Sequence, residues 1–162
     1  MIEVRNVTKK YGSKAVVDDV SLTVKRGGVT SFIGPNGAGK STLLSIISRL
    51  MPHDAGEVLI DGDLVTKTKS NDLAKKLSIL KQENHISVRL TVRELVSFGR
   101  FPYSQGRLTG DDQNHINAAL EYMELGDLQH RFLDQLSGGQ RQRAYVAMVI
   151  AQDTDYVLLD EP

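Results

Sequence analysis

The chain contains no cysteine, carries no net charge and has no long hydrophobic run. The absence of cysteine excludes disulfide bonds and thiolate metal sites and fits a reducing cytoplasm. Because 20 Lys and Arg residues balance 20 Asp and Glu residues, nothing indicates a general electrostatic attraction to nucleic acid. The longest apolar run, residues 146–151, is far too short to cross a bilayer, so any connection to a membrane requires a partner.

With 162 residues and 40% apolar side chains, the chain has the size of one domain and can bury a core. It shows no internal repeat and no low-complexity segment. Alternation and turn signals predict strands, which cover residues 2–7, 15–24, 29–33, 57–60, 64–65, 78–81 and 156–159. Helical spacing and capping signals predict helices, which cover residues 42–50, 73–77 and 138–152 and two further helices that begin after Thr91 and Thr109.

A glycine-rich stretch lies between the expected strand 29–33 and the following helix; it reads Gly34, Pro35, Asn36, Gly37, Ala38, Gly39, Lys40, Ser41 and Thr42. Its glycines allow backbone N–H groups to turn inward around an anion, and the helix points the positive end of its dipole at the same place. Lys40 can reach the β- and γ-phosphates, and the Ser41 hydroxyl can coordinate Mg²⁺. We interpret the stretch as a phosphate-binding loop and not as an ordinary Gly-rich turn.

An acidic pair, Asp160 and Glu161, follows the apolar run 156–159. Such a run is typical of a fully buried parallel strand, and open α/β sheets bind ligands at the carboxyl ends of their strands. We predict that Asp160 holds Mg²⁺ through water and that Glu161 polarises the water that attacks the γ-phosphate. The alternative is a solvated turn before Pro162, which the phosphate-binding loop upstream disfavours.

A second short stretch precedes the expected helix 138–152 and reads Leu136, Ser137, Gly138, Gly139 and Gln140. It offers a hydroxyl group, free backbone N–H groups and a helix N-terminus, which together suit an anion. The residues alone support a flexible capped loop equally well.

The chain resembles the ATP-binding cassette (ABC) ATPases over essentially its whole length. The resemblance lies in the order of Tyr11, the glycine-rich stretch 34–42, Gln82, the stretch 136–140 and the run 156–161. The resemblance implies an α/β fold: a P-loop NTPase parallel-sheet core with an N-terminal antiparallel β subdomain and an inserted helical subdomain. It divides one domain into residues 1–82 (nucleotide-binding core and β subdomain), 83–135 (helical subdomain) and 136–162 (signature helix and final strand).

The resemblance also implies a role for each matching residue. Tyr11 would stack on adenine, although by itself it is an ordinary turn tyrosine. Gln82 would sense Mg²⁺ and the attacking water. The signature residues Leu136, Ser137, Gly138, Gly139 and Gln140 would contact the ATP bound by the other copy in a head-to-tail homodimer. The catalytic set is then Lys40, Gln82 and Glu161; the Mg²⁺ ligands are Ser41, Gln82 and Asp160; and ATP is bound by Tyr11 and residues 34–42.

Residues 96–103 are similar to a segment of the cassettes that serve importers of iron–siderophore complexes, haem and cobalamin, in which the surrounding groove receives a helix of the membrane subunit. The alternative is that residues 96–103 only form a helix end and a turn stabilised by aromatic packing. The resemblance implies an ATPase at the cytoplasmic face of a bacterial membrane, with permease subunits and an extracellular substrate-binding protein as partners, energising import of iron–siderophore complexes. An ABC ATPase that works on ribosomes or DNA, and an ATP-binding regulatory module without efficient turnover, remain open.

Complete cassettes continue beyond the acidic pair with further strands, helices and a switch histidine, so we expect these residues to be part of a longer protein. In the family a later strand lies between the strand before the phosphate-binding loop and the strand that ends at Asp160. Its absence is expected to leave unpaired backbone groups, a poorly stable chain and at most weak hydrolysis. The four histidines, His53, His85, His115 and His130, show no ligand spacing and are expected on surfaces or loops.

Overall fold

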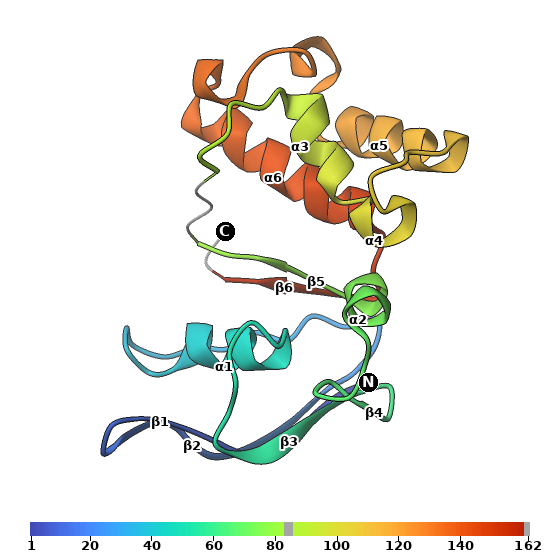
Figure 1. Ribbon diagram of the computed structural model, residues 1–162. Helices are drawn as coiled ribbons and strands as arrows, with labels where there is room; N and C mark the ends of the chain where they lie inside the picture. Colours follow the sequence, from blue (N-terminus) through green and yellow to red (C-terminus); the bar gives the residue numbers. More distant parts are fainter. Residues whose placement is uncertain (83–85, 161–162) are drawn as a thin grey trace. The chain divides into compact units, whose positions relative to one another are not determined.

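A computed structural model describes residues 1–82 and 86–160 of the chain (Figure 1). The chain divides into two compact units, Met1–Leu73 and Ala74–Pro162, and each is described by itself. Among the described residues, no helix combines the length and the apolar character that a bilayer span requires.

The first unit is built on an antiparallel four-stranded sheet with the strand order β2-β1-β3-β4. Its strands are β1 (Ile2–Tyr11), β2 (Lys14–Val24), β3 (Ala55–Ile60) and β4 (Asp63–Leu64). Ile2 and Val4 of β1 pair with Ile60 and Val58 of β3, and all four are buried, because alternate residues of paired strands share one face. The predicted antiparallel β subdomain is confirmed.

Helix α1 (Lys40–Ile47) starts two residues earlier and ends three residues earlier than the sequence predicts. The end is set by Arg49, which has a left-handed φ of 58°. The backbone N–H groups of Leu50 and Met51 turn back to the Ser45 carbonyl, which closes the helix. The guanidinium of Arg49 donates to the Val65 carbonyl at 2.8 Å and so ties this helix end to the chain beyond β4.

The predicted strand over residues 29–33 is wrong. In the described part of the chain no strand lies between β2 and α1, and the side chains of Val29 and Ile33 are 97% and 96% exposed. A strand needs a neighbour to receive its backbone hydrogen bonds, and no described strand pairs with this segment. Hydrophobic residues alone therefore do not make a strand here.

The second unit contains a two-stranded parallel sheet and a group of helices. Strands β5 (Leu77–Leu80) and β6 (Tyr156–Leu159) pair in parallel. The helical elements, in chain order, are α2 (Ser70–Lys76, which leads into this unit), α3 (Val92–Phe98), α4 (Phe101–Ser104), α5 (Gly110–Tyr122), η1 (Gly126–Leu128), η2 (Leu133–Gln135) and α6 (Gly138–Gln152). Both ends of α6 agree with the prediction, whereas α2 starts three residues early.

The predicted capping boxes start α3 and α5. The hydroxyl of Thr91 accepts from the Glu94 N–H, and the Glu94 carboxylate accepts from the Thr91 N–H at 2.7 Å. Thr109 and Asp112 repeat this exchange at the start of α5. The backbone N–H and the hydroxyl of Thr91 hold the pKa of Glu94 below its usual range. These caps satisfy N–H groups that a helix start otherwise leaves unbonded.

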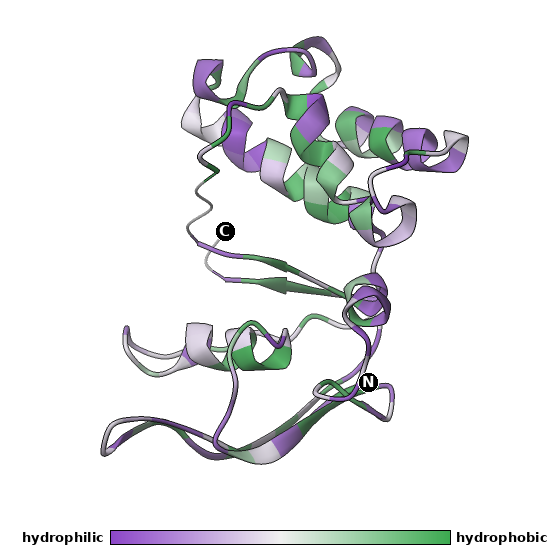
Figure 2. Ribbon diagram, in the orientation of Figure 1, coloured by the Kyte–Doolittle hydropathy of each residue, from purple (hydrophilic) through white to green (hydrophobic). Residues whose placement is uncertain are grey.

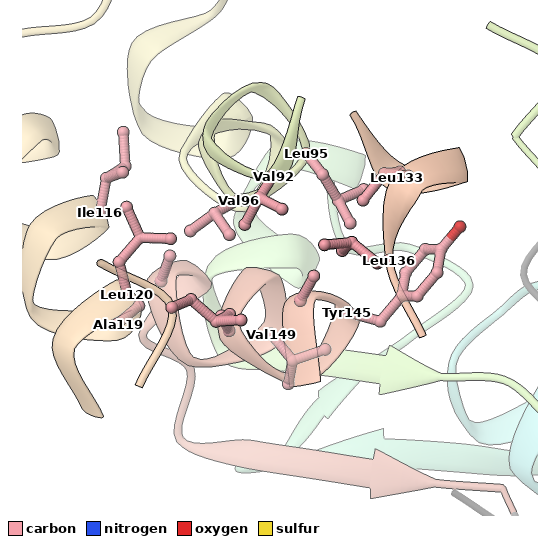
Figure 3. Packing of buried hydrophobic residues seen from close by; sticks show 14 of the residues in the cluster. Val92, Leu95, Val96, Ile116, Ala119, Leu120, Leu133, Leu136, Tyr145 and Val149 are labelled. Atoms are coloured by element: carbon pink, nitrogen blue, oxygen red, sulfur yellow. The ribbon is translucent and has the colours of Figure 1, made fainter. Parts of the chain in front are cut away.

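Helices α3, α5 and α6 pack against one another and form the core of the second unit (Figures 1 and 3). Figure 3 shows Val96 of α3, Leu120 of α5 and Val149 of α6 within the same buried cluster. The first turns of α6 are hydrophilic, and its later turns, like β5 and β6, are mainly hydrophobic (Figure 2). The helical character predicted for this part of the chain is confirmed over its described residues.

Strand β6 is parallel as predicted, but it is not buried on both faces. Tyr156 and Leu158 are buried, whereas Val157 and Leu159 are 49% and 50% exposed. In the described part of this unit, helices cover one face of the two-stranded sheet (Figure 1). Alternate residues of a strand point to opposite faces, so only half of the apolar run reaches the helices.

The end of α3 lies so close to α6 that only glycine fits there. A Cβ atom on Gly99 would lie 2.2 Å from the Met148 carbonyl oxygen. Replacing Gly99 with Ala in the complete protein is expected to lower the free energy of unfolding by about 1–3 kcal/mol, because backbone on both sides must move. Urea unfolding measures the loss. Gly126→Ala, where a Cβ meets nothing within 4 Å, is the control and should leave stability nearly unchanged; equal effects of the two changes would contradict the close approach.

Candidate nucleotide site

The phosphate-binding loop has a backbone that requires glycine at two positions. Gly37 and Gly39 have φ angles of 79° and 86°, in the left-handed region. At Gly39 a Cβ atom would also lie 2.5 Å from the Val16 carbonyl oxygen of β2. The turn is closed by the Ala38 N–H, which donates to the Pro35 carbonyl at 3.2 Å. Strand β2 therefore holds the loop against the start of α1.

The start of α1 carries a concentration of positive charge. Its N-cap is Gly39, and no side chain caps the helix, so the N–H groups of the first turn are not bonded to a capping side chain. The ammonium group of Lys40 bends back over the loop and donates to the Gly34 and Pro35 carbonyls at 2.7 and 3.0 Å. Ser41, in the first turn of α1, has an exposed side chain. Helix N–H groups, a lysine and a hydroxyl in one place fit a polyphosphate.

Tyr11 ends β1 in the same unit as the loop. Its side chain is 50% exposed, and its hydroxyl donates to the Met51 sulfur at 3.0 Å. The ammonium of Lys9 lies 5.7 Å from the centre of its ring. Such an aromatic ring, held at its edge and half exposed, can offer a face to a planar base.

Gln82 and Asp160 follow neighbouring parallel strands of the second unit. Leu80, the last residue of β5, is paired with Leu159, the last residue of β6. The Asp160 N–H donates to the Leu80 carbonyl at 2.9 Å, which extends the pairing by one step. Asp160 is half-buried and Gln82 is exposed. The structure thus brings these two predicted residues to one edge of the sheet, the edge where α/β folds bind ligands.

The predicted Mg²⁺ ligands are divided between the units, with Ser41 in the first and Gln82 and Asp160 in the second. All three supply the oxygen atoms that Mg²⁺ prefers. Glu161, the predicted water-activating residue, lies outside the described residues. Within residues 1–82 and 86–160, no group of three or more His, Cys, Asp or Glu side chains is arranged to hold a metal.

The signature stretch caps α6. The Ser137 hydroxyl accepts from the Gln140 N–H at 3.2 Å, and the Gln140 side chain accepts from the Ser137 N–H at 2.9 Å. Leu136 is buried in the core, which anchors the stretch. Gly138 and Gly139 are exposed, and a Cβ atom on either would meet nothing within 4 Å. Packing among the described residues therefore gives no reason for glycine at these two positions.

A buried ion pair, which sequence reasoning did not find, holds residues 99–103 against α5 and α6. Arg100 is 2% exposed and donates to the Asp112 carboxylate at 2.9 Å and to the Ala151 carbonyl at 3.0 Å. Its guanidinium also lies 3.9 Å from the centre of the Tyr103 ring. The backbone N–H of Thr109 and then Arg100 hold the pKa of Asp112 below its usual range, against the effect of burial. The only sequence signal was the capping pattern of Asp112.

Two aromatic side chains beside this pair are exposed: Phe98 by 52% and Phe101 by 56%. The predicted segment 96–103 therefore combines a rigid buried anchor with an apolar surface.

Two of the described histidines, His53 and His115, make local contacts. His115 lies 3.6 Å from Asp111 and 4.0 Å from Asp153, and the His53 ring bonds the Gly56 carbonyl at 3.1 Å. His85 lies outside the described residues.

Comparison with known proteins gives consistent matches. The family model described as ABC transporter matches residues 17–162. The chain is similar to the petrobactin import ATP-binding protein YclP of Bacillus subtilis (strain 168), with 65% identity over 162 residues, which are 100% of this chain and 64% of YclP. It is 44% identical over 154 residues to the iron(3+)-hydroxamate import ATP-binding protein FhuC of the same organism, covering 94% of this chain and 57% of FhuC. The chain thus spans less than two thirds of the length of these curated relatives.

Among solved structures, the fold is similar to the ATP-binding cassette MJ0796. One dimeric structure, of a post-hydrolysis state bound to ADP and Pi, has a TM-score of 0.84 and 33% identity, covering 100% of this chain and 74% of that one. Another dimeric structure of MJ0796, a bacterial ABC transporter cassette, has a TM-score of 0.83 and 34% identity with the same coverage. The α/β fold with an antiparallel β subdomain and a parallel sheet is shared with these cassettes.

Proposed function

Because the chain belongs to the ABC transporter family, we propose that it is the ATP-binding and ATP-hydrolysing part of a subunit that energises import of iron–siderophore complexes. The observation that carries this proposal is 65% identity, over the whole chain, to a petrobactin import ATP-binding protein. The glycine-dependent loop at the start of α1 supports nucleotide binding independently, because its geometry fits phosphates without reference to any relative.

ATP binding is proposed to begin at the loop 34–42. Phosphate oxygens would replace the Gly34 and Pro35 carbonyls as partners of the Lys40 ammonium, which already lies over the loop. The N–H groups at the start of α1 would bond the same phosphates, and Tyr11 would stack on the base. The lysine therefore needs only a small movement to reach its ligand.

Hydrolysis is proposed to use the edge of the second sheet. Mg²⁺, when bound, would be held by Ser41, Gln82 and Asp160 and would neutralise charge on the phosphates. Glu161 would accept a proton from the attacking water, and Gln82 would orient that water. The adjacent strand ends of β5 and β6 support the pairing of Gln82 with Asp160.

The active form is proposed to be a homodimer in which each copy completes the site of the other. Ser137, Gly138 and Gly139 would contact the γ-phosphate held by the partner copy's loop. Two observations support this: both glycines are exposed and a Cβ atom on either would meet no described residue within 4 Å, and the similar cassette MJ0796 forms dimers. A backbone free of Cβ atoms allows a ligand to approach the N–H groups of α6 closely.

The subunit is proposed to work at the cytoplasmic face of the bacterial membrane, with permease subunits and an extracellular substrate-binding protein. Residues 83–135 would be the helical subdomain that contacts the permease, between the nucleotide-binding core 1–82 and the signature and final strand 136–162. Exposed Phe98 and Phe101 would contact a helix of the permease. The buried Arg100 between them would keep that surface in place.

Co-purification of the complete protein tests this function. From solubilised membranes of its natural host, we expect it to carry along a polytopic membrane protein, and the double variant Phe98→Ala/Phe101→Ala should lose that protein because the apolar contact area is removed. Tyr122→Ala is the matched control, since Tyr122 is an aromatic residue 78% exposed on α5. Recovery with ribosomes or DNA instead, and no membrane protein, would contradict the importer assignment.

A further inference from the structure

Two segments of the second unit that are far apart in sequence run side by side. One follows Gln82 by several residues, and the other immediately precedes the signature stretch. The Leu133 N–H donates to the Leu90 carbonyl at 2.9 Å, and the Val92 N–H donates to the Arg131 carbonyl at 2.9 Å. Between these bonds, Thr91 forms an antiparallel bridge with Phe132. Backbone hydrogen bonds thus join residues 90–92, which follow Gln82, to residues 131–133, which lead into the signature stretch.

Side chains extend this connection at one end. Arg89 lies with its guanidinium 4.0 Å from the centre of the Phe132 ring and donates through Nε to the Asp134 carboxylate at 3.1 Å. We call Arg89, Phe132 and Asp134 the Arg89 cluster. Asp134 is part of the short helix η2, and the next element of the chain is the cap of α6 at Ser137. The cluster therefore holds the chain just before the signature stretch, and Asp134 lies three residues before Ser137.

The Arg89 cluster does not belong to the hydrophobic core. The side chains of Arg89 and Asp134 are 60% and 59% exposed. They border a hollow of about 310 Å³ that is also lined by Val88, Arg141 and Tyr145. An exposed ion pair beside open space contributes little to folding stability. Its arrangement can therefore be changed without unfolding the chain.

We propose that Arg89 is a positioning residue for the signature stretch. By holding Phe132 and Asp134, it sets the orientation of η2 and so of Ser137 relative to the segment that follows Gln82. A signature stretch that is already in the binding orientation can contact the partner's nucleotide directly. Without Arg89 the stretch must first be ordered, and the cost of this ordering weakens the dimer. This inference rests on the proposed dimer, and it concerns the assembly of the site and not the binding of ATP to the loop.

The test uses the complete protein carrying Glu161→Gln, so that ATP is bound and not consumed. Adding Arg89→Ala is expected to raise the dissociation constant of the ATP-dependent dimer about three- to tenfold, the range of an exposed ion pair plus a cation–π contact. Analytical ultracentrifugation at several protein concentrations gives that constant. Binding of a fluorescent ATP analogue to the monomer should be unchanged, because the loop belongs to the other unit. Arg131→Ala, at an exposed arginine of the same segment, is the matched control and should change neither quantity.

A charge exchange separates positioning from a general structural effect. Arg89→Asp and Asp134→Arg should each weaken the dimer, and the double variant should recover most of the affinity because the ion pair is restored in reverse. Equal dimer affinity with and without Arg89→Ala, or no recovery in the exchanged pair, would overturn the role of Arg89 alone. If the Glu161→Gln parent stays monomeric with saturating ATP, both the dimer and the role of Arg89 are overturned.

Discussion

Replacing Glu161 with Gln in the complete protein is expected to reduce ATP turnover about 10²- to 10⁴-fold, the contribution of a positioned general base. Glutamine has nearly the same shape as glutamate but cannot accept the proton of the attacking water. ATP binding should persist, because the loop 34–42, which is proposed to hold the phosphates, is untouched. Release of inorganic phosphate measures turnover, and equilibrium binding measures the affinity of the loop for ATP.

The same Glu161→Gln variant should accumulate as a dimer when ATP is present, because the step that separates the copies no longer occurs. Size-exclusion chromatography with light scattering shows the mass with and without ATP. Glu121→Gln, at an exposed carboxylate of α5, is the control and should hydrolyse ATP normally. If the Glu161→Gln variant hydrolyses ATP at the normal rate, Glu161 is not the general base.

Gly138→Asp in the complete protein is expected to lower ATP hydrolysis about 10²-fold, because the carboxylate would keep the γ-phosphate from the donor N–H groups at the start of α6. A side chain at this position meets open space within its own chain, and a carboxylate in the first turn of α6 suits the helix dipole, so the folded state should tolerate it. The carboxylate would repel the γ-phosphate of the partner's nucleotide. Thermal unfolding, expected to be unchanged, and phosphate release are the two measurements.

Mixing variants tests whether the signature acts on the partner copy. A dimer of one Gly138→Asp copy and one Lys40→Ala copy has one site with an intact loop and an intact signature. Hydrolysis should therefore reappear on mixing two inactive proteins, at a fraction of the normal rate. Gly126→Asp, at another open position of the second unit, should remain active by itself. No recovery on mixing would contradict a site shared between copies.

Features that depend on neighbours in sequence were predictable. The capping boxes at Thr91 and Thr109 join residues three apart, and both start helices as predicted. The sequence also predicted α6 over residues 138–152, and the helix has these bounds. The glycine-rich turn before α1 was predictable for the same reason, because its glycines and the start of the helix lie within nine residues.

Features that depend on distant partners were not predictable from one sequence. The apolar segment 29–33 has strand composition, but a strand requires a paired neighbour, and none of the described strands supplies one. The apolar run 156–159 is half exposed, because helices cover one face of its sheet in the described part of the unit. Composition therefore shows which segments have apolar side chains, but the neighbouring elements determine which of these side chains are buried.

By itself, the sequence determined the local features: a glycine-rich loop before α1, a capped glycine pair at the start of α6, and an acidic pair after a strand. Only the tertiary structure decided which of these parts meet. It put Asp160 beside the strand that leads to Gln82, buried Arg100 against Asp112, and set Arg89 on Phe132 and Asp134. The physical reason is range: caps and turns are made by groups a few bonds apart, whereas pairing between strands and between buried charges requires the chain to fold first.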